Sequence, residues 1–219
     1  MADIQIDPKL INFLILLPLF FISIAFHEFA HGFVAHKFGD DTAKNAGRLT
    51  LNPIKHIDIF GTIIVPIFAY VSGMPVIGWA KPVPVDRRNF KNPLKDDLKV
   101  SFAGPFSNFL LSVLVLIIFI ILFHAGVEVN NRFGNILIYG IYINIFLFLF
   151  NILPIPPLDG SYIVYDIFPN KVTAWLLKPG FFGIFLLMFL IYSPLWKYFM
   201  QFVNIIFSTY LHLAGFNEI

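Results

Sequence analysis

The sequence predicts an all-α polytopic membrane protein with about four transmembrane helices and one re-entrant segment. Of the 219 residues, 58% are hydrophobic and only 13% are charged, whereas soluble domains have roughly 45–50% and 25%. A soluble globule of this length cannot bury so much apolar surface. Five apolar stretches, separated by short polar loops, account for this composition. The chain is therefore expected to enter the membrane several times.

Three of the stretches are long enough to cross a bilayer, which takes about 20 apolar residues. They cover residues 10–36, 99–124 and 134–153. The stretch 57–71 is shorter and contains Gly61 and Pro66, so we expect it to re-enter rather than span. The last stretch, residues 180–213, is interrupted at Ser193-Pro194. It is expected to supply one span and an interfacial helix.

The composition also excludes several classes of protein and site. The chain has no cysteine, which excludes disulfides, Cys-ligated zinc, iron–sulfur clusters and thiol catalysis. Its net charge is +2 and no run of Lys and Arg is present, so nucleic acid is not an expected partner. No repeat or long linker divides the chain, and residues 1–219 are expected to form a single domain. Any metal must be held by His, Asp or Glu.

The most specific motif lies in the first span, where His27-Glu28-Phe29-Ala30-His31 has the pattern H-E-x-x-H. Histidines four residues apart share one helix face and can hold one metal ion. Glu28 lies beside the open coordination position, where it can take a proton from a metal-bound water. A charged group in a bilayer costs about 2.5–3.5 kcal/mol, and a divalent cation would compensate this cost. Two imidazoles, a carboxylate and a water suit zinc.

The third ligand must come from another part of the chain. The sequence has Val34 and Lys37 where the metzincin pattern places Gly and His, which excludes that subclass. Glu128 and Glu218 are carboxylates in a loop and in the C-terminal tail. Asp159 is better placed, because Leu158-Asp159-Gly160 directly follows the span 134–153.

A comparison of helix lengths supports Asp159 and predicts the topology. From Leu10 to His27, and from Gly134 to Asn151, a helix rises by the same distance, about 25 Å. If these two spans run parallel, both motifs arrive at a similar depth, the span 99–124 runs the other way, and segment 57–71 returns to its starting side. Most Lys and Arg residues then lie on the side where the first span ends, which is cytoplasmic by the positive-inside rule. If segment 57–71 spans instead, the charges divide more evenly.

Several further segments resemble one known family. Ala103-Gly104-Pro105 with Asn108, and the segment 151–160 that begins Asn-Ile-Leu-Pro and ends Leu-Asp-Gly, together with H-E-x-x-H, resemble the site-2 protease family of intramembrane zinc metalloproteases. Segments 47–53 and 78–85 are similar to its short bacterial and archaeal subgroup, which has no PDZ or CBS domain.

The resemblance implies a site and one further structural element. It implies that His27, His31 and Asp159 bind one Zn²⁺, that Glu28 is the general base, and that Asn151 helps to hold the substrate backbone. It also implies a small membrane-embedded β-hairpin, which together with the re-entrant segment would occupy residues 45–85.

The predicted function is therefore zinc-dependent intramembrane endopeptidase activity on transmembrane segments, as in regulated intramembrane proteolysis. The expected location is the cell membrane, with the active site toward the cytoplasm. Expected partners are transmembrane protein substrates and membrane lipid, and a homo-oligomer is left open. One alternative is a proton- or metal-coupled transporter, since intramembrane His and Asp can relay protons, although no inverted halves are visible. The other is an inactive scaffold, against which the intact H-E-x-x-H pattern argues.

Overall fold

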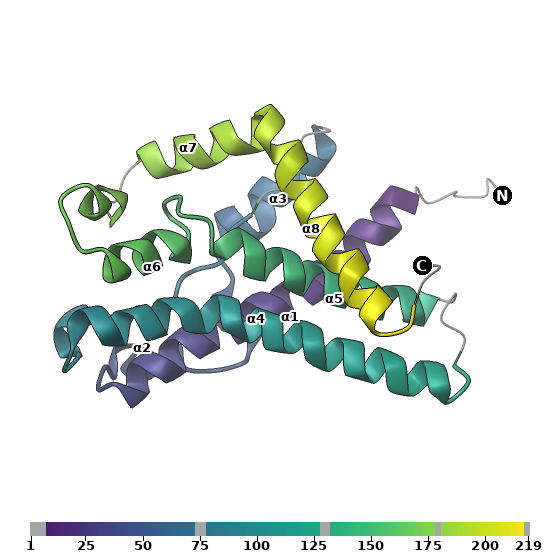
Figure 1. The fold of residues 1–219 in the computed structure, drawn as a ribbon, viewed down its shortest axis with the longest axis horizontal. Coiled ribbons are helices and arrows are strands. Elements are labelled where there is room, and N and C mark those ends of the chain that lie inside the picture. Colours follow the sequence, from purple (N-terminus) through teal and green to yellow (C-terminus); the bar gives the residue numbers. More distant parts are fainter. Residues whose placement is uncertain (1–7, 73–77, 128–131, 178–180, 217–219) are drawn as a thin grey trace.

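The computed structural model describes residues 8–72, 78–127, 132–177 and 181–216, and every regular element in these ranges is helical (Figure 1). The α-helices are α1 (Pro8–Lys37), α2 (Thr42–Asn45), α3 (Val65–Val71), α4 (Pro93–His124), α5 (Arg132–Asn151), α6 (Asp159–Ile167), α7 (Phe181–Tyr192) and α8 (Pro194–Leu213). Shorter helical turns are η1 (Pro53–His56), η2 (Ile59–Ile64), η3 (Arg87–Asn89) and η4 (Thr173–Leu177).

Helices α1, α4 and α5 pack side by side and form the centre of the molecule (Figure 1). Each has a described part long and apolar enough to cross a membrane: Leu16–Lys37, Pro93–His124 and Phe133–Asn151. Asn144 of α5 and Asn108 of α4 both bond to Ser23 of α1, whereas His31 bonds to Val100. Helix α4 therefore runs antiparallel to α1. It is also antiparallel to α5, because Phe109 lies beside Phe148 and Val115 lies beside Gly140. Both directions agree with the sequence prediction.

The last apolar stretch is broken where the sequence predicts a break. Helices α7 and α8 meet at Ser193 and are bent by 77°. The Ser193 side chain accepts a hydrogen bond from Leu195 N, and Pro194 occupies the first turn of α8, which is a common start for a helix. The described chain therefore has three candidate spans, or four if the bent pair counts as one.

Segment 57–71 forms η2 and α3, an apolar helical stretch from Ile59 to Val71. The chain then comes back to the beginning of this stretch. Trp79 N donates to Gly61 O at 3.0 Å, and Lys81 N donates to His56 O at 3.0 Å. The Trp79 ring lies where a side chain at position 61 would begin. This doubling back is the shape expected of a re-entrant segment.

The β-hairpin that the resemblance implies is not confirmed, since the described part of residues 45–85 contains no strand. Side chains bond to backbone groups that a β-ladder would use. His56 Nε2 donates to Thr50 O at 2.8 Å, and Arg48 Nη2 donates to Lys81 O at 2.7 Å. Val83 N donates to the Glu28 carboxylate. The segment is extended but bonded to its surroundings instead of to a second strand.

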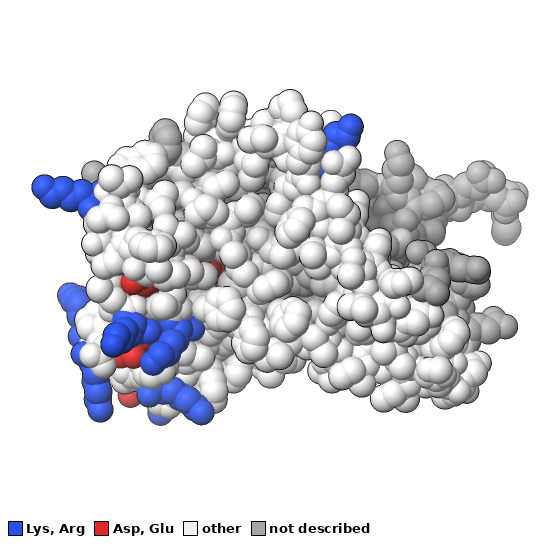
Figure 2. All heavy atoms as spheres, viewed as in Figure 1, with Lys and Arg blue, Asp and Glu red and all other residues white. Residues whose placement is uncertain are grey.

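Charge is distributed unevenly over the surface. Figure 2 shows most of the visible Lys and Arg side chains at the end of the molecule that holds α2 and the start of α4. Large apolar side chains are exposed along the central helices instead, including Ile22 and Phe33 on α1 and Phe102, Phe106 and Leu110 on α4.

Candidate metal centre

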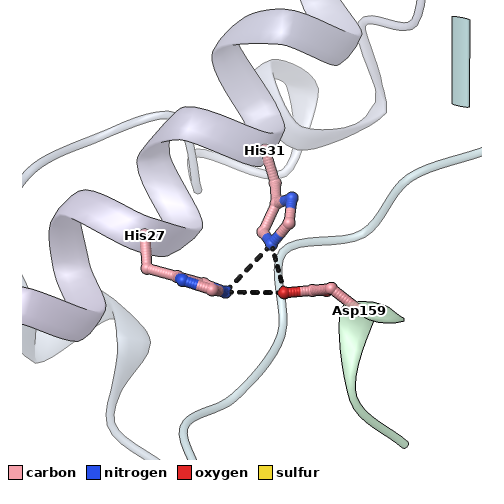
Figure 3. Close-up of side chains that lie close together, drawn as sticks. All are labelled: His27, His31 and Asp159. Carbon is pink, nitrogen blue, oxygen red and sulfur yellow. Dashed lines mark hydrogen bonds and ion pairs between the residues drawn. The ribbon is translucent and has the colours of Figure 1, made fainter. Parts of the chain in front are cut away.

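Two histidines of α1 and an aspartate of α6 meet beside α4 (Figure 3). His27 Nε2 lies 3.0 Å from His31 Nε2. Asp159 Oδ2 lies 3.1 Å from His27 Nε2 and 3.4 Å from His31 Nε2. With zinc–ligand bonds near 2.0–2.2 Å, two ligand atoms of a tetrahedral site lie roughly 3.3 Å apart. The three atoms therefore have the spacing of one face of a tetrahedral zinc site.

Two further observations fit a cation at this position. Asp159 Oδ2 is buried and has no hydrogen-bond partner among the described residues, which is costly unless a cation compensates it. A Cβ built on Gly104 would lie 2.2 Å from His31 Nε2 and 2.7 Å from His27 Nε2. Only glycine at this position of α4 keeps the space in front of both imidazoles clear.

The other nitrogen of each imidazole is bonded to α4. His31 Nδ1 donates to Val100 O at 2.7 Å, because a carbonyl oxygen can only accept. His27 Nδ1 lies 2.7 Å from Asn108 Oδ1. In both bonds Nδ1 carries the proton, so the lone pair on Nε2 of each ring is available to a metal ion. Such second partners fix the tautomer and orientation of metal-binding histidines.

The orientation of the Asn108 amide is itself determined by its neighbours. Asn108 Nδ2 donates to Ser23 O at 3.1 Å and to Asn144 Oδ1 at 3.0 Å. Asn144 Nδ2 in turn donates to Ser23 Oγ at 2.9 Å and to Gly140 O at 2.8 Å. All three side chains are at least 98% buried. With both Asn108 N–H groups used in this network, its oxygen must face His27.

Asp159 is positioned by the turn between α5 and α6. The prolines that follow α5, Pro154, Pro156 and Pro157, cannot continue the helix. Leu158 is buried in a cluster with Leu187 and Ile191 of α7, against which Trp196 of α8 packs. A Cβ on Gly160 would lie 2.1 Å from Ile152 O, so glycine allows the turn to close tightly. Asp159 then begins α6, where the helix dipole favours a negative charge.

Glu28 follows His27 on α1 and is half-buried. Its Oε2 accepts a hydrogen bond from Val83 N at 2.7 Å. The extended segment that contains Val83 therefore lies next to the H-E-x-x-H motif. The arrangement has the parts of a metallohydrolase site: two imidazoles, a carboxylate ligand and a second carboxylate beside them.

The chain is similar to several known proteins. Residues 15–134 match the sequence model of peptidase family M50. "Putative zinc metalloprotease YwhC" of Bacillus subtilis is 43% identical over 181 residues, which cover 81% of this chain and 80% of that protein. "Putative zinc metalloprotease Rip2" of Mycolicibacterium smegmatis is 29% identical over 210 residues, 93% of this chain and 78% of that protein. No solved structure matches the chain.

The chain belongs to peptidase family M50, the site-2 protease family. Membership confirms the resemblance recognised in the sequence. This M50 peptidase is a zinc metalloprotease that acts on protein substrates. Its three apolar helices agree with a multi-pass membrane protein.

The structure does not bring Asn151 into the group of three. Asn151 is the last residue of α5, and its Nδ2 donates to Leu147 O at 2.9 Å, within its own helix. It is half-buried and precedes Asp159 by eight residues. A role in this M50 peptidase would require its amide to change partners.

Sequence reasoning missed the amides around the histidines. Asn108 entered only as part of the resemblance, and Ser23 and Asn144 were not singled out. The signal that could have found them is a polar side chain inside a strongly apolar span, which is rare unless it is paired or functional.

A second buried polar cluster, also missed, lies between α4 and α6. Arg87 pairs with Asp97 of α4 and lies 3.6 Å from Asp166 Oδ1 of α6. Burial raises the pKa of Asp166 to about 8, helped by the adjacent Asp97 and opposed by the Arg87 charge.

Proposed function

We propose that this M50 peptidase is an intramembrane endopeptidase that hydrolyses peptide bonds within transmembrane segments, as in regulated intramembrane proteolysis. The observation that carries the proposal is what surrounds the metal centre. His31 and His27 lie level with Val100 and Asn108 of α4. Between these two levels, α4 exposes Phe102 and Phe106, each more than 40% accessible. A peptide bond that reaches this depth belongs to a membrane-embedded segment.

The depth also suits the predicted position near one face. Val100 is seven residues from the start of α4 at Pro93, or about 10 Å along the helix. The exposed lysines nearest this end include Lys37, Lys44, Lys95 and Lys99. By the positive-inside rule this end is cytoplasmic. The chain lacks cysteine, so a single Cys in place of Lys44 should react with a membrane-impermeant maleimide only from the cytoplasmic side. Labelling from outside would contradict this orientation.

In this proposal His27, His31 and Asp159 hold one Zn²⁺, and Glu28 is the general base. Zinc, when bound, polarises the scissile carbonyl and lowers the pKa of water to about 7. The Val83 N–H holds one oxygen of the Glu28 carboxylate and leaves the other to accept a proton. Glu28 would take this proton from the water that attacks the scissile carbonyl, and could then pass it to the leaving amine. The Nδ1–H bonds to Asn108 and Val100 keep both imidazoles in the ligating orientation.

Asn151 is proposed to bond to the backbone of the unwound substrate. Its position supports this role, because it ends α5 just before the turn that carries Asp159. Its amide would exchange the Leu147 carbonyl for a substrate carbonyl. Asn151→Ala should then raise KM more than it lowers kcat for a transmembrane substrate. Unchanged KM would contradict the role.

The remaining expectations follow from the same proposal. Residues 1–219 act as a single protease domain, with lipid against the exposed apolar side chains of the central helices. Its substrates are transmembrane proteins. A homo-oligomer stays a prediction.

The experiment that tests the proposal uses purified protein in liposomes with a model transmembrane substrate. Wild type should cleave the substrate inside its apolar segment, and a zinc chelator should stop cleavage. Glu28→Gln should hold zinc, but its cleavage rate should fall about 10²–10⁴-fold, which is the contribution typical of general acid–base catalysis. Cleavage only in soluble peptides, or normal turnover by Glu28→Gln, would contradict the proposal. Zinc flux without cleavage would favour a transporter. Comparing membrane proteomes with and without this variant would then identify the accumulated substrates.

A further inference from the structure

Arg87 lies between helices α4 and α6, at the side of the metal centre that holds the third ligand. Its guanidinium pairs with Asp97 on α4 and approaches Asp166 on α6. Both aspartates are more than 90% buried, whereas the Arg87 side chain is 30% exposed. The same guanidinium lies over two tyrosine rings of α6, 5.1 Å from the centre of Tyr162 and 5.7 Å from that of Tyr165.

These contacts hold one face of α6. Tyr162, Tyr165 and Asp166 are three and four residues apart, so they share one side of the helix. Asp159 begins the same helix, one turn before Tyr162. A nine-residue helix is too short to be stable on its own, so its orientation depends on such contacts. A small rotation of α6 would move Asp159 Oδ2 away from the two imidazoles.

The segment that carries Arg87 is itself attached to the H-E-x-x-H helix. Val83 N donates to Glu28, and Asp86 N donates to Asp40 Oδ2 at 2.7 Å. Asp40 is fully buried and also accepts from Asn89 Nδ2 at 2.8 Å. Residues 83–87, called here the strap, therefore contact the proposed base at one end and α6 at the other.

We propose that Arg87 is a positioning residue, which orients α6 from the strap so that Asp159 reaches the metal. The proposal rests on the ligand role of Asp159 given above. Lysine can replace Arg87 only in part, because a compact ammonium can neither fork between two carboxyl groups nor lie flat over aromatic rings. Asp97 and Asp166 are the acceptors that hold the arginine, and they do not act on the metal themselves.

The test uses full-length protein in detergent, with Co²⁺ in the site as a spectroscopic probe. The visible absorption of Co²⁺ reports the number and geometry of its ligands. Arg87→Met should lower Co²⁺ affinity by about 10–100-fold, as loss of outer-shell partners does, and shift the spectrum toward that of Asp159→Asn. Arg87→Lys should recover only part of this loss.

The neighbouring arginine provides a matched control. The Arg88 side chain is 87% exposed, and Asp86 is its only ion-pair partner among the residues that the structure describes, so Arg88→Met should leave affinity and spectrum unchanged. Equal changes in both variants, or no change in Arg87→Met, would overturn the proposal.

A third variant separates positioning from simple charge compensation and covers the case in which Arg87→Met does not fold. The triple variant Arg87→Met, Asp97→Asn, Asp166→Asn removes the buried charges together with the arginine. If it folds with the wild-type spectrum and affinity, Arg87 only compensates charge and the proposal is wrong. If it folds with the altered spectrum, positioning is supported. If wild type and Asp159→Asn have the same spectrum, the ligand role of Asp159 fails instead.

Discussion

The two histidines and the aspartate of the metal centre are held in very different ways. His27 and His31 lie on a long spanning helix, and α4 fixes both rings through Asn108 and Val100. Asp159 begins a nine-residue helix outside the apolar bundle. Its helix is fixed by a tight turn and by contacts with α4 and Arg87.

This contrast shows which part of the metal centre of this M50 peptidase is held rigidly. The half of the site that carries His27 and His31, called here the histidine half, lies on long helices. The asparagine side chains that support it, Asn108 and Asn144, are hydrogen-bonded to each other and at least 98% buried. The aspartate half depends on the docking of a short helix that could not form alone. Changes in the histidine half should therefore act directly on metal binding, and changes around α6 should act through its orientation.

The largest effect is expected when a side chain on α4 fills the space in front of His27 and His31. Gly104→Ala places a methyl group within 2.2 Å of His31 Nε2, so metal affinity should fall by more than about 100-fold. Gly140→Ala is the matched control, because its new Cβ would lie 3.5 Å from Val115, an ordinary contact. Metal titration of both purified variants checks this. Full metal binding by Gly104→Ala would mean that the ion lies elsewhere.

A smaller effect is expected when the support of one ring is removed. Asn108→Leu keeps the branched shape of the side chain but removes the acceptor for His27 Nδ1, so metal affinity should fall about 10–100-fold. Ser112→Ala is the control one turn further along α4, since in the described part of the chain Ser112 bonds only to Phe109 O of its own helix. The same titration compares them, and equal affinities would show that the amide network does not orient His27.

The smallest effect concerns the aspartate half and its pH dependence. Burial beside Asp97 raises the pKa of Asp166 to about 8, whereas an unfolded Asp titrates near about 4. Between these values the folded protein holds one proton more than the unfolded chain. Stability should therefore fall as pH rises through this window.

Asp166→Asn checks this sign. Arg87 and Asp97 face the Asp166 carboxyl, and the amide keeps its shape without titrating. The free energy of unfolding, measured by denaturant titration in detergent between pH 5 and pH 8, should depend less on pH for Asp166→Asn than for wild type. A wild-type curve with the same slope would contradict the raised pKa.

The sequence was sufficient for the parts of the molecule that follow from periodicity and apolar length. The i, i+4 spacing of His27 and His31 predicts a shared face, and Pro194 predicts the break before α8. The equal rises to His27 and Asn151 predict the parallel course of α1 and α5. The same comparison predicts that Asp159 lies near the two histidines, and its Oδ2 lies 3.1 Å from His27 Nε2.

The rest depends on contacts between segments distant in sequence. Helix α4 begins at Pro93 and not near residue 99, because Asp96 accepts a bond from Asn92 N and Asp97 pairs with Arg87. In the sequence these charges indicate a loop. The β-hairpin that the resemblance implies is not found near Thr50, where the His56 side chain bonds to the Thr50 carbonyl. No local pattern encodes either pairing.

The central claim is that His27, His31 and Asp159 share one zinc ion, and zinc content under chelator challenge tests it most directly. Asp58 provides the control, because its carboxylate accepts from Gly61 N at 2.8 Å and caps the start of η2. Wild type, Glu28→Gln and Asp58→Asn should each keep one zinc per chain, while Asp159→Asn should lose it. An Asp159→Asn protein that holds zinc as firmly as wild type would contradict the claim.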